Sequence, residues 1–463
     1  MCTNRIICQL VVAVLAVLAL QSPSWAGKVS AEKANELGTK LTPMGAIKEG
    51  NKAGTIPPFK GDILGAPSWV KYQGTGHHMP NPYPDDKPLF TITKDNYQQH
   101  KENLTTGQIA LFEKYPSFAM PIYPSRRDFR YTDKVYENTK INATTATLVS
   151  EGNGFDHAFF GTPFPFPENG LELIWNHQAA PNYGLTDGTL DSIAVFPNGT
   201  RSESQKNREE RNILYYSPFM TRESYTAQPL GGMVMVQVTD PPRAKGEIIL
   251  VHEYRDVSQQ SRDAWQYLPG TRRVRTAPTI SYDFPVPPGG LRTVDDVLLF
   301  NGATDRYTWK MEPSREIYIP YNSSLLDDPK RKYSEFLTPF HIDPKVMRYE
   351  LHRVWVVVGE LRPDKRHIYG KRRLYLDEDS WAGVLAENYD TRGNLWRSNM
   401  RNMSAMYDMP GMGPRVEVYH DLQSSAYIAN YLVNETSGPP VVVSKPWEDG
   451  YFTVQQVRKL GKR

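Results

Sequence analysis

Short apolar segments bounded by turn residues crowd the second half of the chain. They are rich in Val, Ile, Tyr and Trp, which favour pleated strands. We predict strands or strand pairs at residues 231–240, 246–255, 263–278, 315–321, 348–361, 365–379 and 381–399. Helical segments do not alternate with them, as they would in a parallel β-α-β sheet. The pattern favours a mainly β (α+β) fold with a strongly curved antiparallel sheet, to which flanking segments add helices.

Two of these strands, 348–361 and 365–379, have apolar side chains on both sides near their far ends. In the first strand, Tyr349, Leu351, Trp355 and Val357 share one side, and in the second strand Leu374 and Leu376 do. Strands that are buried on both faces have nearly continuous apolar runs of this kind. We therefore expect other parts of the chain to cover each face of the sheet.

The region from residue 27 to about residue 150 is rich in Pro, Gly and polar residues. Its aromatic content is too high for a disordered linker, so we predict a long, irregular but ordered wrap with one short helix within 93–116. Residues 151–463 form the predicted β domain and end in a short helix at 452–463. We expect 27–463 to be one compact unit.

The first 26 residues have the pattern of a signal peptide. Asn4 and Arg5 precede an apolar run at 10–20, and the small residues Ser24 and Ala26 predict cleavage near Ala26 and Gly27. Both cysteines, Cys2 and Cys8, lie in this segment. The mature protein would therefore have neither a disulfide nor a thiolate metal site.

Charge and motifs restrict the function further. The formal net charge of the whole sequence is only +3, so nucleic acid is not an expected partner. The sequence contains no Walker loop, H-E-x-x-H motif, nucleophile elbow or dinucleotide fingerprint. We predict no cofactor and no catalytic residue.

Two other groups of residues could carry chemistry. His77 and His78 are adjacent, but adjacent side chains diverge in an extended chain, so we expect no metal site there. Carboxylates gather at Asp295 and Asp296 and again at Asp377, Glu378 and Asp379. Such clusters could serve acid–base or glycosidase chemistry, although neighbouring carboxylates usually bond within their own turn.

One arm of the predicted hairpin at 263–278 is strongly basic. The arms flank Pro269 and Gly270 and carry Trp265, Tyr267 and Leu268 on one side of the turn and Arg272, Arg273 and Arg275 on the other. Guanidinium groups bind phosphates and carboxylates in a bidentate manner. The arginines are therefore candidates for contact with an acidic head group or an acidic partner. The alternative is cross-strand pairing with Asp377, Glu378 or Asp379 at a solvated face.

The hairpin and the segment 348–397 resemble a bacterial exported family catalogued as domain-of-unknown-function family 1329, as do segments 41–61 and 87–96. The core of that family is similar to the outer-membrane lipoprotein-sorting (LolA/LolB-like) superfamily. Carriers of that superfamily have an incomplete antiparallel β-barrel, closed by helices over an apolar cavity. Their W-x-Y-x-P and D-x-x-G hairpins correspond to Trp265–Arg275 and Asp390–Gly393. The resemblance implies an envelope role and transfers no catalytic residue.

We therefore expect a periplasmic carrier or adaptor of a Gram-negative bacterium that binds a lipid or other hydrophobic molecule in a half-barrel cavity. Its partners would be a membrane transporter and outer-membrane components. The candidate cavity residues are Trp265, Tyr267, Leu268, Tyr349, Leu351, Trp355, Val357, Leu374 and Leu376. One alternative is a non-carrying periplasmic scaffold with a filled core and an exposed aromatic patch. Another is a secreted hydrolase that uses one of the two acidic clusters.

Overall fold

The computed structural model describes residues 29–181, 184–260, 262–277, 282–443 and 445–462. The predicted signal peptide and its cleavage site near Ala26 and Gly27 lie outside these residues. Within the described ranges, no helix combines the length and apolar character needed to cross a membrane.

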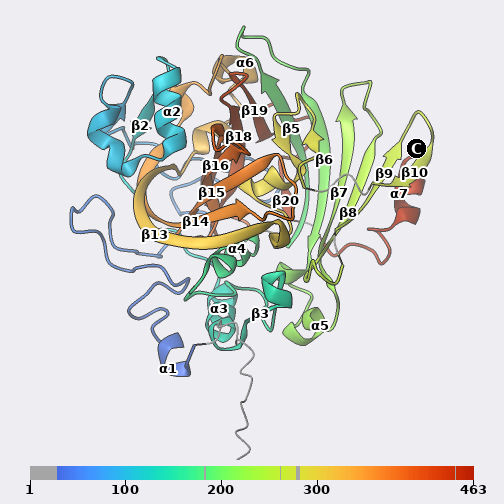
Figure 1. Ribbon diagram of the computed structural model, residues 1–463, viewed down its shortest axis with the longest axis horizontal. Helices are drawn as coiled ribbons and strands as arrows, with labels where there is room; N and C mark the ends of the chain where they lie inside the picture. Colours follow the sequence, from blue (N-terminus) through green and yellow to red (C-terminus); the bar gives the residue numbers. More distant parts are fainter. Residues whose placement is uncertain (1–28, 182–183, 261, 278–281, 444, 463) are drawn as a thin grey trace, which may run out of the picture.

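One large curved sheet organises the protein (Figure 1). Within the described residues it has sixteen strands, whose main path is β1 (Phe90–Ile92), β2 (Met120–Ile122), β14 (Tyr349–Leu361), β15 (Tyr369–Asp377), β16 (Gly383–Asp390), β17 (Leu395–Met406), β18 (Gly411–Asp421), β19 (Ala426–Leu432), β5 (Leu185–Val195), β6 (Gln205–Ile213), β7 (Leu230–Asp240), β8 (Ile248–Tyr254), β9 (Asp263–Leu268) and β10 (Arg273–Thr276). Off this path, β13 (Tyr307–Pro320) pairs with β14, and β20 (Val442–Val443) pairs with β5.

The sheet confirms the predicted mainly β fold and incomplete barrel. Its strand pairs are antiparallel, apart from a short parallel contact between β2 and β14. The path runs from β1 to β10 without closing on itself. Two small strand pairs lie apart from the main sheet: β3 (Thr147–Val149) with β4 (Gly154–Asp156), and β11 (Pro285–Val286) with β12 (Arg292–Thr293).

Each segment predicted as a strand forms one or two strands, including the hairpin of β9 and β10. Seven strands of the described sheet were not predicted: the short strands β1, β2 and β20, and the longer strands β5, β6, β18 and β19. β6 is the clearest case, because its sequence QKNREERNI has almost no apolar alternation and its side chains are mostly half-buried. It is a strand because β5 and β7 pair with it on both sides.

The helices are short and lie around the sheet (Figure 1). The α-helices are α1 (Ala31–Ala34), α2 (Thr106–Lys114), α3 (Asp133–Thr145), α4 (Gly170–Gln178), α5 (Arg222–Thr226), α6 (Tyr333–Phe336) and α7 (Val454–Leu460). The 3-10 helices are η1 (Tyr97–Asn103), η2 (Ser150–Gly152), η3 (Leu214–Tyr216), η4 (Val294–Leu299), η5 (Thr304–Arg306), η6 (Ser324–Asp327) and η7 (Pro344–Val346).

Two regions of helix differ from what the sequence pattern predicts. The helix predicted within 93–116 is divided into η1 and α2, because Thr105 and Gln108 form a capping box that starts a new helix. The helix α3 was not predicted. Its buried positions include Thr139 and Asn142, and these polar residues hide its inward face from an apolar pattern.

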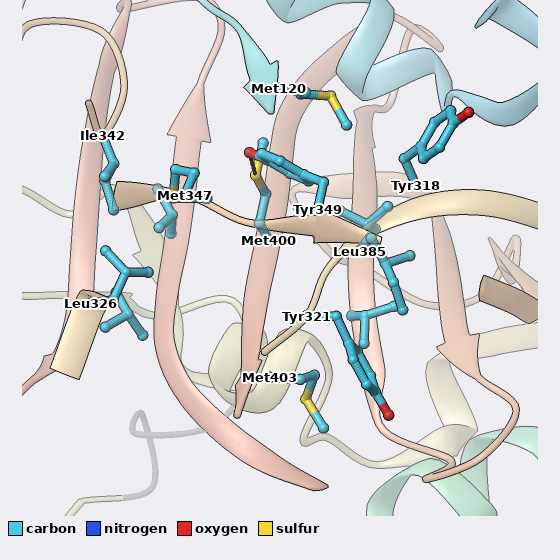
Figure 2. Packing of buried hydrophobic residues seen from close by; sticks show 14 of the residues in the cluster. Met120, Tyr318, Tyr321, Leu326, Ile342, Met347, Tyr349, Leu385, Met400 and Met403 are labelled. Carbon is cyan, nitrogen blue, oxygen red and sulfur yellow. Dashed lines mark hydrogen bonds between the residues drawn. The ribbon is translucent and has the colours of Figure 1, made fainter. Parts of the chain in front are cut away.

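Two large hydrophobic cores lie on opposite faces of the middle of β14 and β15, so both faces are covered there, as predicted. Val354, Val356 and Tyr375 belong to the first core. Their alternating neighbours Val357 and Leu374 belong to the second core. Figure 2 shows part of the first core, where Met120 of β2, Tyr349 of β14, Leu385 of β16 and Met400 of β17 lie close together. The N-terminal region is therefore an integral part of the hydrophobic interior.

Candidate functional site

A pocket opens where the sheet splits between β18 and β5. The strand β19 joins them only as far as Leu432, which pairs with Asp191. Beyond this point, no strand among the described residues pairs with both residues 411–415 of β18 and residues 186–190 of β5, and β20 pairs with Asp187 and Thr186 instead. The gap leaves a pocket of about 100 Å³.

The lining of this pocket is mostly apolar, with a few charged groups. Met406, Met409 and Met412 line it together with Leu190, Leu298, Pro181, Pro414, Tyr131, Tyr431 and Val441. Thr186, Gly188, Gly413, Glu209, Arg211 and Arg415 complete it. Methionine is flexible and polarizable, and it is common on surfaces that accommodate varied apolar partners. The lining can therefore adapt to an apolar group.

The charged groups of the pocket are held by defined partners. Arg211 donates to Glu209 at 2.5 Å and to the hydroxyl of Tyr431 at 3.0 Å. Burial lowers the pKa of Arg211, but the negative charge of Glu209 outweighs burial, so the pKa of Arg211 is raised overall. Arg415 lies 3.1 Å from Asp327. The two arginines that line the pocket are therefore each held by a carboxylate.

The methionines were missed by sequence reasoning, although a signal was present. Met400, Met403, Met406, Met409 and Met412 recur at every third position. A strand has a side-chain period of two residues, so a spacing of three does not indicate a strand face. Met400, Met403, Met406 and Met412 belong to the first core, and the last three of the five line the pocket.

The nine predicted cavity residues lie elsewhere. None of them lines this pocket among the described residues. Tyr267 is buried under α7 in a small separate core, where Trp265 is half-buried, and Leu268 is half-buried opposite Arg273. The other six residues pack in the two large cores: Tyr349 and Leu351 in the first, and Trp355, Val357, Leu374 and Leu376 in the second.

Tyr349 also faces a second, much smaller cavity. This cavity measures about 10 Å³ and is lined in addition by Met400, Val418, His341 and His420. It is roughly large enough for a single water molecule. It is therefore too small to serve as a binding site for a hydrophobic ligand.

The hairpin arginines are exposed, as expected for a solvated face. Arg273 and Arg275 lie on β10, opposite Leu268 and Gln266. Arg272 lies in the turn with a φ of 53° instead of on the strand. The alternative in which they pair with Asp377, Glu378 or Asp379 is wrong, because all three carboxylates are buried with other partners: Glu378 with Arg353, Asp379 with Arg127, and Asp377 with Ser380.

The cluster of Asp377, Glu378 and Asp379 joins the N-terminal region to the sheet. Arg127 binds both carboxylate oxygens of Asp379, at 2.7 and 2.8 Å. Arg353 donates to Glu378 at 2.8 Å. Burial raises the pKa of Asp377 and of Glu378. These groups form a buried ion-pair network that stabilises the fold.

The same network contains the group of side chains best placed to bind a metal ion. One ligand atom each of His352, Asp377 and Asp379 lies within 4.8 Å of the others. Arg127 already engages both oxygens of Asp379, and His352 contacts Glu350 at 3.3 Å. Positively charged side chains of the protein thus already neutralise much of the carboxylate charge that would otherwise attract a metal ion.

Asp295 and Asp296 lie in a second buried network. Arg372 contacts Asp295 at 2.7 Å and Asp296 at 3.1 Å. Burial opposes ionisation of Asp295, but Arg372 and His367 outweigh it and lower its pKa. Both acidic clusters predicted from the sequence are therefore enclosed in ion pairs.

The adjacent histidines diverge, as expected. His77 is exposed and its Nδ1 lies 3.2 Å from the carbonyl oxygen of Gly74. His78 pairs with Asp327 at 2.7 Å. Burial lowers the pKa of His78, but its bond to Asp327 outweighs this, so the pKa is raised overall.

Comparisons with known proteins place the chain among uncharacterized relatives. A family model described as "Protein of unknown function (DUF1329)" matches residues 91–458. The uncharacterized protein PA3922 of Pseudomonas aeruginosa is 41% identical over 449 residues, covering 94% of this chain and 94% of its own length.

Solved structures show more distant likeness. A DUF1329 family protein from Desulfovibrio piger is 12% identical, with 62% of this chain and 96% of that chain covered and a TM-score of 0.43. The LolA superfamily protein NE2245 from Nitrosomonas europaea is 12% identical, with 63% and 100% covered and a TM-score of 0.38.

Proposed function

This chain belongs to the DUF1329 family of proteins of unknown function, and we propose that it is a periplasmic carrier or adaptor for a lipid or another hydrophobic molecule. It would work with membrane transport proteins and outer-membrane components of the cell envelope. The observation that carries the proposal is the methionine-lined pocket between β18 and β5.

A large free-energy cost opposes the movement of a lipid through water without a carrier. Exposing one methylene group to water costs about 0.8 kcal/mol, so a 16-carbon chain costs on the order of 12 kcal/mol to move unaided. An apolar pocket removes part of this cost by contact alone. It needs complementary shape and no fixed catalytic groups.

The size of the pocket limits what it accepts in this conformation. Its volume of about 100 Å³ is below the roughly 300–1,000 Å³ typical of ligand pockets. It therefore admits a short apolar segment, and a whole acyl chain would require the pocket to enlarge. Rotation of Met406, Met409 and Met412 about their flexible side-chain bonds provides one route to enlargement.

The predicted cavity residues would contact a ligand only after a larger change. Val357, Leu374 and Leu376 are fully buried in the second core, so a ligand could reach them only if that core opened. The pocket offers the less costly site. Arg211 and Arg415 are better placed than the hairpin arginines to contact an acidic head group of a ligand in the pocket, because both line it.

The proposal is tested by loading the protein with lipid. Delipidated protein is incubated with an envelope lipid extract, repurified and weighed by native mass spectrometry. We expect a stoichiometric apolar species on the wild type. The variant Met409→Trp fills the pocket and should retain at least about tenfold less of it, since one large side chain occupies most of the space.

The matched control is Met311→Trp, which introduces the same side chain at a methionine on β13 that is 38% exposed and does not line the pocket. Bare wild-type protein in every preparation would contradict the carrier function. Equal retention by the two variants would leave carriage intact and exclude the pocket as its site.

A second candidate function, a non-carrying scaffold, is favoured by a different observation. The two large cores fill the protein on both faces of the sheet. In the N-terminal half, exposed apolar side chains include Leu64, Trp69 and Leu89, which are 51%, 59% and 65% exposed. Such residues suit protein–protein contact. Failure of the loading experiment would favour this function.

A further inference from the structure

A cationic patch lies at the end of the sheet where α7 covers the hairpin of β9 and β10 (Figure 1). It consists of seven exposed basic residues: Lys245, Arg272, Arg273, Arg275, Arg458, Lys459 and Lys462. Within the part of the chain that the structure describes, no ion pair involves any of the seven. Their charge is therefore directed towards solvent.

Tertiary contacts bring these residues together from three distant segments. The hydroxyl of Tyr267 donates to the carbonyl oxygen of Gly461 at 2.5 Å, which places the end of α7 beside the tip of the hairpin. A Cβ atom on Gly246 would lie 3.3 Å from Pro269, so the turn between β7 and β8 adjoins the hairpin turn. Lys245, Arg272 and Lys462 consequently flank one tip.

The patch gathers positive charge at one end of the molecule. Its seven charges exceed the formal net charge of +3 for the whole sequence, so the other residues together carry a formal net charge of −4. A negatively charged surface would attract the molecule through this end. Such attraction would orient the protein on the surface.

Protection of the sheet edge explains only part of the patch. Positive charge on an edge strand such as β10 discourages pairing with another chain. The same reason does not apply to the basic residues of α7, or to Lys245 in a turn. Their convergence requires another explanation.

We propose that the cationic patch docks the protein end-on to an anionic phospholipid surface. The seven side chains are long, exposed and spread over three turns, a strand and a helix, and none lines a described pocket. This arrangement does not grip a single anion. It matches a fluid surface of many mobile anions, which attracts each nearby Lys or Arg separately. An acidic protein would instead favour fixed, paired geometry.

The patch and the pocket share no residue, so docking is independent of the proposed carriage. The hairpin arginines would bind head groups of the membrane, not the head group of a ligand in the pocket. A pocket-filling variant such as Met409→Trp should therefore dock normally.

The test is co-sedimentation of the full chain with vesicles. We expect binding to phosphatidylcholine vesicles that contain phosphatidylglycerol, and much weaker binding to phosphatidylcholine alone. Binding should fall at least about tenfold between about 0.05 and 0.5 M NaCl, because salt screens exposed charges. The triple variant Arg272→Glu, Arg273→Glu and Arg275→Glu should lower binding at low salt by about tenfold or more.

The matched control reverses three exposed lysines outside the patch, Lys52→Glu, Lys71→Glu and Lys140→Glu, which changes the net charge equally. Equal loss in both triple variants would overturn the proposal, because only net charge would then matter. Wild-type binding that is absent, or that salt does not weaken, would also overturn it, even if the patch variant failed to fold. If the wild type bound no vesicles but bound an acidic protein, and the patch variant lost that binding, the patch would be assigned to the acidic protein instead.

Discussion

A single buried ionisable residue can make the free energy of unfolding depend on pH. Glu172 lies in the first turn of α4 and is completely buried. One of its oxygens accepts the backbone N–H of Glu168 at 2.7 Å, and the other has no hydrogen-bond partner among the residues that the structure describes. Burial raises the pKa of Glu172 to about 7. The folded protein therefore binds this proton more tightly than the unfolded chain does.

The stabilising effect of Glu172 protonation should be present below about pH 4.5 and lost as the pH rises through about 7. Replacing it by Gln removes the ionisation and keeps an acceptor for Glu168. We expect Glu172→Gln to raise the free energy of unfolding by roughly 1–3 kcal/mol at about pH 8, with little effect at about pH 5. Urea unfolding at both pH values checks this. A difference that does not vary with pH would show that this carboxyl group does not titrate in the range.

At the scale of elements, α7 and the hairpin depend on each other. A seven-residue helix is too short to be stable alone in water. Val457 of α7 is fully buried in the small core that also contains Tyr267 and Leu250. The helix therefore forms because the apolar side of the hairpin and β8 gives it a surface to cover.

Gly461, directly after α7, tests this dependence. A Cβ atom there would lie 2.4 Å from the ring of Tyr267, so Gly461→Val must displace either the ring or the end of the helix. We expect a loss of about 1–3 kcal/mol in the free energy of unfolding, as for other overpacked sites. The control is Gly270→Ala in the hairpin turn, where nothing lies within 4 Å of the added Cβ atom. Equal stability of the two variants would mean that α7 docks only weakly.

At the scale of the whole molecule, buried charges connect the N-terminal region to the sheet. Besides Asp379, Arg127 contacts the carbonyl oxygens of Ile47 at 2.8 Å and Pro57 at 3.1 Å. Arg353 of β14 also contacts the carbonyl oxygen of Ile47, at 3.2 Å. Arg127 thus ties irregular N-terminal segments to the turn after β15, and Arg353 ties one of these segments to β14.

Removal of Arg127 should destabilise the entire protein. Arg127→Ala leaves Asp379 buried without its partner, and breaking such a pair costs about 3–5 kcal/mol. We expect this loss in a single unfolding transition if residues 27–463 are one compact unit, measured by calorimetry. The control is Lys60→Ala, which breaks a 3.4 Å pair between Asp128 and a lysine whose side chain is 59% exposed, and should change stability by less than about 1 kcal/mol. Two separate transitions would show that the wrap and the β domain unfold independently.

Local patterns in the sequence were enough for the fold class and for many of its strands. The alternation in 348–361 and the turn residues around the hairpin act over a few residues, so they predict β14, β9 and β10 directly. The turn at Gly393 is another example, since its φ of 86° suits glycine. The family could also be recognised, because its motifs are local.

The candidate site depended on tertiary structure instead. The pocket exists because β19 ends at Leu432 while β18 and β5, far apart in the chain, extend beyond it. Arg127 and Asp379 are separated by 252 positions, and Tyr267 and Gly461 by 194. A local pattern determines which residues can form a strand or carry a charge. The folded chain brings residues together across these long loops. Only this tertiary structure decides which distant strands lie beside a gap and which charged side chains form pairs.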